Sequence, residues 1–239
     1  MNRICSLFAL GLCAIATARA DLTIDQEVQG AGPVSQMFIR IKGDKTRVDA
    51  SPQVSTIIDA KSGDMLNLMN EQKKYMRISG EQAKAMMQTA MQSVPKNNDK
   101  PKLTATGKKE TINGFETQEY TSETPQGTSH YWIAPSYPEG AAVLKQLQSI
   151  APQAWGISSS AAPAYADFPG VPLRTEIAIG GKEIVSTIKS IKQDALPDTL
   201  FSPPADFQEM KMPDIGRLLG GKTVKPPTGT TKPAAAPTP

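Results

Sequence analysis

The sequence predicts a mainly β fold of the α+β kind, in which an antiparallel sheet of about ten strands carries two helices. Three observations predict it. Apolar residues recur at every second position in a series of short segments, which is the period of a strand with one buried face. Turn sequences such as Gly43-Asp44 and Asn113-Gly114 separate these segments. Two other stretches show the period of an amphipathic helix.

The first 20 residues have the three parts of a secretory signal peptide. Arg3 supplies a positive start, an almost wholly apolar run follows from residue 4 to 17, and small residues surround a cut after Ala20. The apolar run is shorter than the roughly 20 residues that cross a bilayer, which argues against a membrane anchor. The sequence therefore predicts a periplasmic or secreted protein, cleaved after Ala20, that is not integral to the membrane.

The composition narrows the classes of function. Both cysteines, Cys5 and Cys13, lie in the predicted signal peptide, so the mature chain has no disulfide and no thiol nucleophile. Without Arg3 and Arg19 the chain keeps 24 basic and 23 acidic side chains, a net charge of +1. This near balance argues against a nucleic-acid partner. The 219 remaining residues suffice for one large domain with a hydrophobic core.

The segment from residue 21 to 78 reads as a series of strands. Leu22, Ile24 and Val28 recur at even spacing before a Gly-Pro break at residues 30–33. Further strands follow up to residue 78, separated by turns. In the strand at 65–71 both faces are partly apolar, which indicates that the second face of the sheet is also covered.

A strongly amphipathic helix is predicted next, beginning where Ser79 and Gln82 have capping-box spacing and ending at Pro95. Its apolar positions form one continuous stripe. They are Ala83, Met86, Met87, Ala90, Met91 and Val94. The methionines have two interpretations: ordinary core packing, or an adaptable surface for a flexible apolar guest.

The second half of the chain repeats the alternating pattern. Strands are predicted at 103–112, 115–123, 128–134, 171–179 and 182–193. A weaker helix is predicted at 138–150, followed to residue 171 by a proline-rich loop of the kind that often forms a rim. Gly, Pro, Thr, Lys and Ala dominate from 213 to 239, which predicts a disordered basic tail after a domain at 21–212.

The sequence offers no residue set for catalysis or for a metal. His130, the single histidine, is adjacent to Ser129, so on a strand their side chains point to opposite faces. A metal site would have only this imidazole and no mature cysteine. Glu116 and Glu119 also fall on opposite faces of one strand and are interpreted as solvated charges. These observations predict a non-enzymatic protein without a cofactor.

Three segments carry a resemblance to a known family. They are Lys42 to Asp49, Ile112 to Thr117, and Leu196 to Phe201 with Pro204. With them the chain, over residues 21–212, resembles an exported bacterial family known as domain of unknown function 4412. More distantly it is similar to the periplasmic lipoprotein carriers. The resemblance implies a strongly curved sheet, or half-barrel, with the helices on its concave side and an apolar cavity suited to acyl chains.

The residues and the resemblance together predict a periplasmic binding or carrier protein for lipid or acyl chains, with its cavity between the methionine-rich helix and the sheet. The alternative is an envelope interaction or sensory protein that uses the sheet to dock a protein partner, without a small ligand. Aromatic residues near the second helix fit either core filling or a cavity mouth. The predicted ligand-binding residues are Met69, Met86, Met87, Met91, Tyr131, Trp132 and Trp155.

Overall fold

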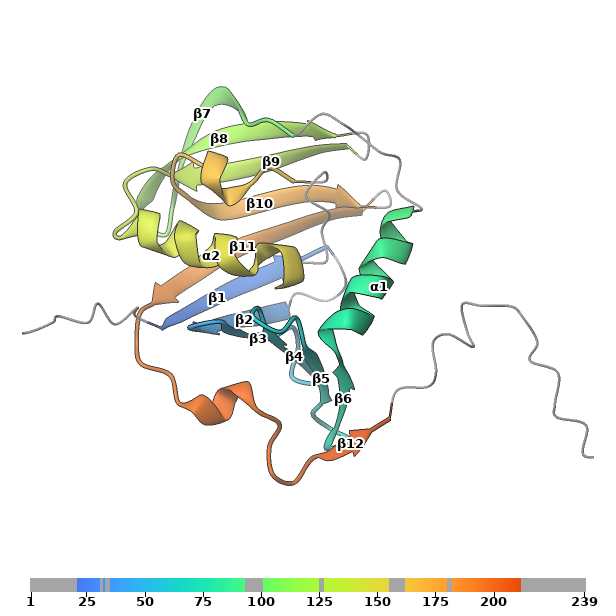
Figure 1. Ribbon diagram of the computed structural model, residues 1–239. Helices are drawn as coiled ribbons and strands as arrows, with labels where there is room; N and C mark the ends of the chain where they lie inside the picture. Colours follow the sequence, from blue (N-terminus) through green and yellow to red (C-terminus); the bar gives the residue numbers. More distant parts are fainter. Residues whose placement is uncertain are drawn as a thin grey trace, which may run out of the picture.

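The computed structural model describes residues 21–30, 32, 35–92, 101–124, 127–154, 162–179 and 182–211. The predicted signal peptide, the predicted tail from 213 onward and Trp155 lie outside these residues. The described residues form twelve strands, two α-helices and two short 3-10 helices (Figure 1).

The twelve strands make one sheet, in the order β12-β6-β5-β4-β3-β2-β1-β11-β10-β9-β8-β7. All neighbours pair antiparallel except β12, which runs parallel to β6. The predicted count of about ten strands is too low. β12 has only three residues, and it joins a strand 134 residues away, where Tyr75 donates to Glu209, so no local pattern signals it. The strands are β1 (Leu22–Gln29), β2 (Ser35–Lys42), β3 (Lys45–Asp49), β4 (Val54–Asp59), β5 (Met65–Met69), β6 (Lys74–Ile78), β7 (Thr104–Ile112), β8 (Phe115–Thr124), β9 (Gly127–Ala134), β10 (Val171–Ile179), β11 (Lys182–Lys192) and β12 (Gln208–Met210).

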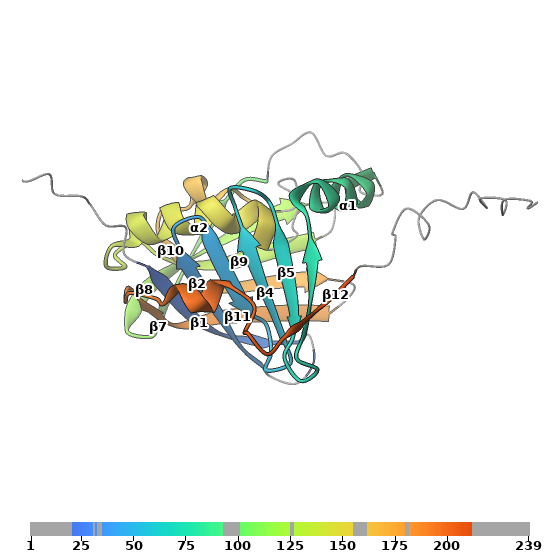
Figure 2. The same ribbon diagram turned by 60° about the horizontal axis from the view of Figure 1, so that its bottom comes forward.

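The sheet is strongly curved, and both α-helices lie on its concave side (Figure 2). α1 (Gly80–Gln92) follows β6 directly, whereas α2 (Gly140–Ala154) lies across the middle of the sheet, against β10 and β3. The 3-10 helix η1 (Tyr165–Asp167) packs beside α2. The second 3-10 helix, η2 (Asp198–Phe201), lies on the convex side. The predicted fold class, a curved mainly β half-barrel with two helices on its concave face, is confirmed.

The start of α1 is held by the capping box that the sequence predicts. The backbone N–H of Gln82 donates to Ser79 Oγ at 3.3 Å, and the backbone N–H of Ser79 donates to Gln82 Oε1 at 2.9 Å. Gly80 lies so close to the turn between β4 and β5 that a Cβ there would stand 2.1 Å from the carbonyl oxygen of Ser62. Glycine is therefore required for α1 to begin against this turn.

One apolar core lies on the concave face, between α2 and the sheet. Val143 and Leu147, one helical turn apart on α2, are 1% and 3% exposed. Alternate residues of the two neighbouring N-terminal strands meet them, as a strand period of two requires. These residues are Leu22, Ile24, Ile39 and Ile41.

A second core lies on the convex face, between η2 and strands β4 and β5. The cross-strand register assigns this face, because Ile57 pairs with Arg47 and Arg47 pairs with Arg40, the neighbour of the inward-facing Ile39. The chain after β11 thus closes a core that α2 does not reach. The buried members are Ile57, Leu66, Leu68 and Phe201.

Candidate ligand-binding cavity

A cavity of about 560 Å³ lies on the concave face, between the sheet, α2 and the loop that contains η1. This volume is within the range of about 300–1,000 Å³ that small-molecule sites occupy. Leu147 and Gln148 of α2 cover it together with the loop from Ala162 to Phe168, which is part of the predicted rim. The residues of its floor are Ile24, Gln26, Val28, Met37, Ile39, Tyr131, Pro172, Thr175, Ile177, Ile184, Ser186 and Ile188.

The alternation of the strands explains why these residues face the cavity, with one exception on β10. A β-bulge between Pro172 and Arg174 interrupts the pairing of β10 with β9. Pro172 and Thr175 therefore both line the cavity although they are three residues apart. Arg174 lies on the opposite face. The bulge thus keeps a charged side chain out of the floor.

A short polar row crosses the otherwise apolar floor. Ser186 of β11 pairs with Thr175 of β10, and Thr175 pairs with Tyr131 of β9. Gln26 of β1 pairs with Ile188, two residues along β11 from Ser186. None of the described residues that line the cavity is Asp, Glu, His, Lys or Arg. The cavity therefore combines apolar walls with a few uncharged polar groups.

Gln26 and Tyr131 are the most deeply buried of these polar groups, and Gln26 is the one with an amide. It is 4% exposed, and its Nε2 has no hydrogen-bond partner within the part of the chain that the structure describes. A buried donor without a partner costs about 1–3 kcal/mol. The sequence prediction missed Gln26, although it interrupts the apolar series Leu22, Ile24 and Val28 at an inward position.

Aromatic rings form one wall of the cavity. Phe168 meets Tyr131 edge-on, with ring centroids 5.3 Å apart, and its ring lies 5.4 Å from that of Tyr165. Burial, with a smaller contribution from Tyr131, raises the pKa of Tyr165 to about 12. Burial also raises the pKa of Tyr131 above its ordinary value. Both phenols are therefore neutral near pH 7, so this wall adds no charge.

The residues predicted to bind ligand are not brought together at this cavity. Tyr131 lines it, whereas Trp132 points to the opposite face, where the guanidinium of Arg174 lies 4.8 Å from its ring centroid. Met69 is half-buried on β5, Met86 of α1 is 41% exposed, and neither is part of the lining. Among the side chains that the structure describes, α2 contributes to the lining of this cavity and α1 does not. Outside the described part of the chain lie the side chains of Met87 and Met91 and the whole of Trp155.

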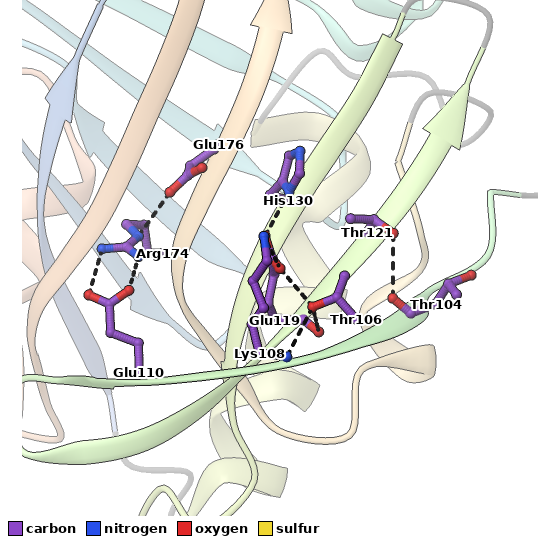
Figure 3. A network of polar contacts seen from close by, with 9 residues as sticks. All are labelled: Thr104, Thr106, Lys108, Glu110, Glu119, Thr121, His130, Arg174 and Glu176. Atoms are coloured by element: carbon purple, nitrogen blue, oxygen red, sulfur yellow. Dashed lines mark hydrogen bonds and ion pairs between the residues drawn. The ribbon is translucent and has the colours of Figure 1, made fainter.

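A network of charged groups occupies the face opposite the cavity, on β7 to β10 (Figure 3). Glu119 of β8 is 3% exposed, so its prediction as a solvated charge is wrong. The reason is a bulge in β7 that places residues 106–108 over it. Glu119 accepts a hydrogen bond from Thr106 Oγ1 at 2.6 Å, and Lys108 Nζ lies 3.2 Å and His130 Nδ1 2.9 Å from its carboxylate oxygens.

Arg174 forms the other half of this network (Figure 3). Its guanidinium donates to both carboxylate oxygens of Glu110, one of them at 3.1 Å. Its Nε lies 3.0 Å from a carboxylate oxygen of Glu176. The ring of Trp132 stacks against the same guanidinium. Because these groups are paired with one another across strands, we interpret the network as structural.

We expect Glu119 to make the stability of the fold sensitive to acid. Burial alone would raise its pKa, but hydrogen bonds from Thr106, His130 and Lys108 outweigh burial and lower the pKa from 4.5 to about 2. The unfolded state then binds the proton more readily, so the stabilisation is complete above about pH 5 and is lost as the pH falls towards about 2. It amounts to about 3 kcal/mol. Urea unfolding of the wild type and of Glu119→Gln between these pH values measures it.

The matched control is Glu116→Gln, on the same strand, since the side chain of Glu116 is 70% exposed. Glu119→Gln should flatten the dependence of the free energy of unfolding on pH, and Glu116→Gln should leave it as in the wild type. Equal slopes for the wild type and both variants would contradict the role assigned to Glu119.

Among the residues that the structure describes, no group of three or more His, Cys, Asp or Glu side chains is placed to hold a metal ion. No helix in that part of the chain has the length and apolar character needed to cross a membrane.

Comparison with known families and curated proteins gives one match. The family model described as "Domain of unknown function (DUF4412)" matches residues 22–207. No curated protein matches the sequence. The family match confirms the resemblance predicted from the three sequence segments.

Solved structures show a distant likeness of fold. PNGF-II is 13% identical with a TM-score of 0.39; the match covers 82% of this chain and 31% of that one, so this chain spans about one third of its length. The lipoprotein LppX of Mycobacterium tuberculosis is 13% identical with a TM-score of 0.36, and the match covers 73% of this chain and 90% of LppX. A LolA superfamily protein of Nitrosomonas europaea is 10% identical with a TM-score of 0.27, and the match covers 77% of this chain and 89% of that protein. At such scores the ligands of these proteins are not transferred to this chain.

Proposed function

The chain belongs to the family described as domain of unknown function (DUF4412), which specifies no activity, and we propose that it is a non-enzymatic periplasmic binding or carrier protein for lipid or acyl chains. The observation that carries the proposal is the cavity of about 560 Å³ beneath α2, whose described lining residues are mostly apolar and include no charged side chain. The periplasmic location rests on the signal-peptide pattern of residues 1–20.

The chemistry of the cavity supports an elongated apolar ligand. Each buried CH₂ group contributes about 0.8 kcal/mol, so about ten of them contribute on the order of 8 kcal/mol before the costs of association are subtracted. Those costs are of similar size, which favours reversible binding over permanent retention. Reversible binding is what a carrier requires.

The lining also supports binding without a reaction. Thr175, Ser186, Tyr131 and Tyr165, which carry hydroxyl groups, line the cavity, but no imidazole or carboxylate belongs to its described lining to activate them. Burial raises the pKa of Tyr165 to about 12, so that phenol is a poor base at neutral pH. The groups that are present orient a ligand better than they transform one.

Native mass spectrometry of the protein, purified without detergent from its own envelope fraction, tests the proposal. We expect a mass increment that corresponds to one apolar molecule per chain, and organic extraction should remove it and identify it. The same protein, once extracted, should recover an adduct when it is mixed with phospholipid vesicles or free acyl chains. A clean apo mass in all of these conditions would contradict the proposal and favour the alternative, a docking module without a small ligand.

A further inference from the structure

The proposed cavity contains a buried hydrogen-bond donor that has no partner in the described part of the chain, and we infer that its ligand carries a neutral oxygen acceptor, such as an ester or ketone carbonyl within an alkyl chain, that meets Gln26. This inference rests on the proposed function and specifies the ligand class for the same cavity.

The strand register fixes the position of Gln26. Register places its side chain on the concave face, where it pairs with Met37 of β2 on one side and Ile188 of β11 on the other, and all three line the cavity. It is 4% exposed, and its Nε2 lacks a partner among the described residues. Buried polar groups are nearly always hydrogen-bonded. The amide N–H of Gln26 therefore needs an acceptor, and a ligand bound in the cavity can supply it.

The charged residues beside Gln26 face away from the cavity. The neighbours of Gln26 along β1 are Asp25 and Glu27, and both point to the opposite face. There Asp25 accepts a hydrogen bond from Gln36 at 2.9 Å, and Glu27 pairs with Lys189 at 3.2 Å. Because the described part of the lining has no cation, an ionised carboxylate or phosphate would be buried against it without a counter-charge, which is unfavourable. The acceptor that suits Gln26 is therefore uncharged.

The apolar residues on either side of Gln26 indicate where the acceptor lies within the ligand. Ile24 and Val28 flank Gln26 on the same face of β1, and both line the cavity. Apolar lining therefore continues along the strand in both directions from the amide. A carbonyl inside a chain, with alkyl segments on either side, satisfies this arrangement better than a polar group at one end.

Three probes with 16 carbons each separate these features: octyl octanoate, with an internal ester; hexadecane, without oxygen; and palmitate, with an ionised terminal carboxylate. The protein purified after export and freed of bound lipid is titrated with each probe by native mass spectrometry, as wild type and as Gln26→Leu. The ratio of the two dissociation constants for one probe cancels the solubility of that probe. We expect Gln26→Leu to weaken the binding of octyl octanoate about tenfold. The binding of hexadecane should be unchanged or tighter.

Ile184→Val is the matched control, because it shortens another residue of the lining without changing a polar group. It should weaken octyl octanoate and hexadecane by the same factor, at most about fourfold. Thermal unfolding checks the fold: Gln26→Leu should be at least as stable as the wild type, since it removes an unpaired buried donor. If that variant does not fold, Gln26→Met repeats the comparison with an unbranched side chain.

The outcomes separate the role of Gln26 from the proposed function of the cavity. Equal changes for octyl octanoate and hexadecane in Gln26→Leu would overturn the role of Gln26 while the cavity remains a lipid site. Palmitate as the tightest probe, weakened by the same substitution, would overturn the neutral acceptor. Failure of the wild type to bind any of the three probes would overturn the proposed function itself.

Discussion

Ala164→Trp should reduce ligand occupancy of the cavity at least about tenfold, whereas Ala166→Trp should leave it unchanged. Ala164 lines the cavity just before η1, and its extended backbone, with φ −70° and ψ 141°, accepts a large side chain. Tryptophan is one of the largest side chains and buries about 150–250 Å² of surface. At this exposed edge of the lining it would occupy space that a ligand needs in the cavity of about 560 Å³.

Ala166 is the appropriate control because it is two residues further along the same loop and, although both alanines are exposed, only Ala164 is part of the lining. Native mass spectrometry of both variants, purified in the same way as the wild type, gives the fraction of chains with an adduct. Thermal unfolding shows whether each variant is folded. Wild-type occupancy in a folded Ala164→Trp variant would place the ligand somewhere other than beneath α2.

Phe201→Ala should lower the free energy of unfolding by about 3–5 kcal/mol. Phe201 ends η2, is 4% exposed and fills the core on the convex face, where it meets Ile57, Leu66 and Leu68. Its removal loses apolar contacts and leaves a space that the paired strands β4 and β5 cannot close. Urea unfolding measures the change.

Thr199→Ala is the control for this substitution, since Thr199 lies in the same turn of η2 but is exposed. It should change the free energy of unfolding by less than about 0.5 kcal/mol. Phe201→Ala should also keep its ligand under conditions in which it stays folded, because Phe201 and the cavity lie on opposite faces of the sheet. A folded variant that has lost the ligand would contradict this separation of the two cores.

The segment around Phe201 is also fastened by polar contacts. Leu196 donates its backbone N–H to Asp21 Oδ2 at 2.8 Å, and Arg47 Nη1 donates to the carbonyl oxygen of Leu200 at 3.1 Å. These contacts join the first described residue of the domain to a segment near its end. They hold η2 in place independently of the apolar core, so the loss expected for Phe201→Ala reflects packing and not detachment of the segment.

Local elements could be predicted from the sequence because their signals are local. The Asn113-Gly114 turn joins β7 and β8 as predicted, with φ of 50° and 83°, which a turn of this hairpin type requires. The predicted capping box forms at Ser79 and Gln82. The helix predicted at 138–150 is found at Gly140–Ala154. In each case the residues that determine the structure are close together in the chain.

The position of the cavity could not be predicted in this way. The methionine stripe indicates an amphipathic helix, but it does not say which helix lies over the middle of the sheet. That depends on the pairing of β1 with β11, for example Thr23 with Lys192, which no local pattern reports. The burial of Glu119 depends in the same way on a bulge in β7, on the neighbouring strand. Gln26 was visible in the sequence as a polar residue at an inward position.

The pairing of β1 with β11 in the middle of the sheet also affects how the chain reaches its native state. β1 is the first strand to be synthesised, yet its second neighbour is complete only at Lys192. The centre of the sheet therefore cannot close until almost the whole domain is available, and folds dominated by such distant pairings form slowly, in milliseconds to seconds. If the chain is exported as its N-terminal pattern predicts, this delay keeps the polypeptide unfolded during secretion. Folding is then completed after the chain has crossed the membrane.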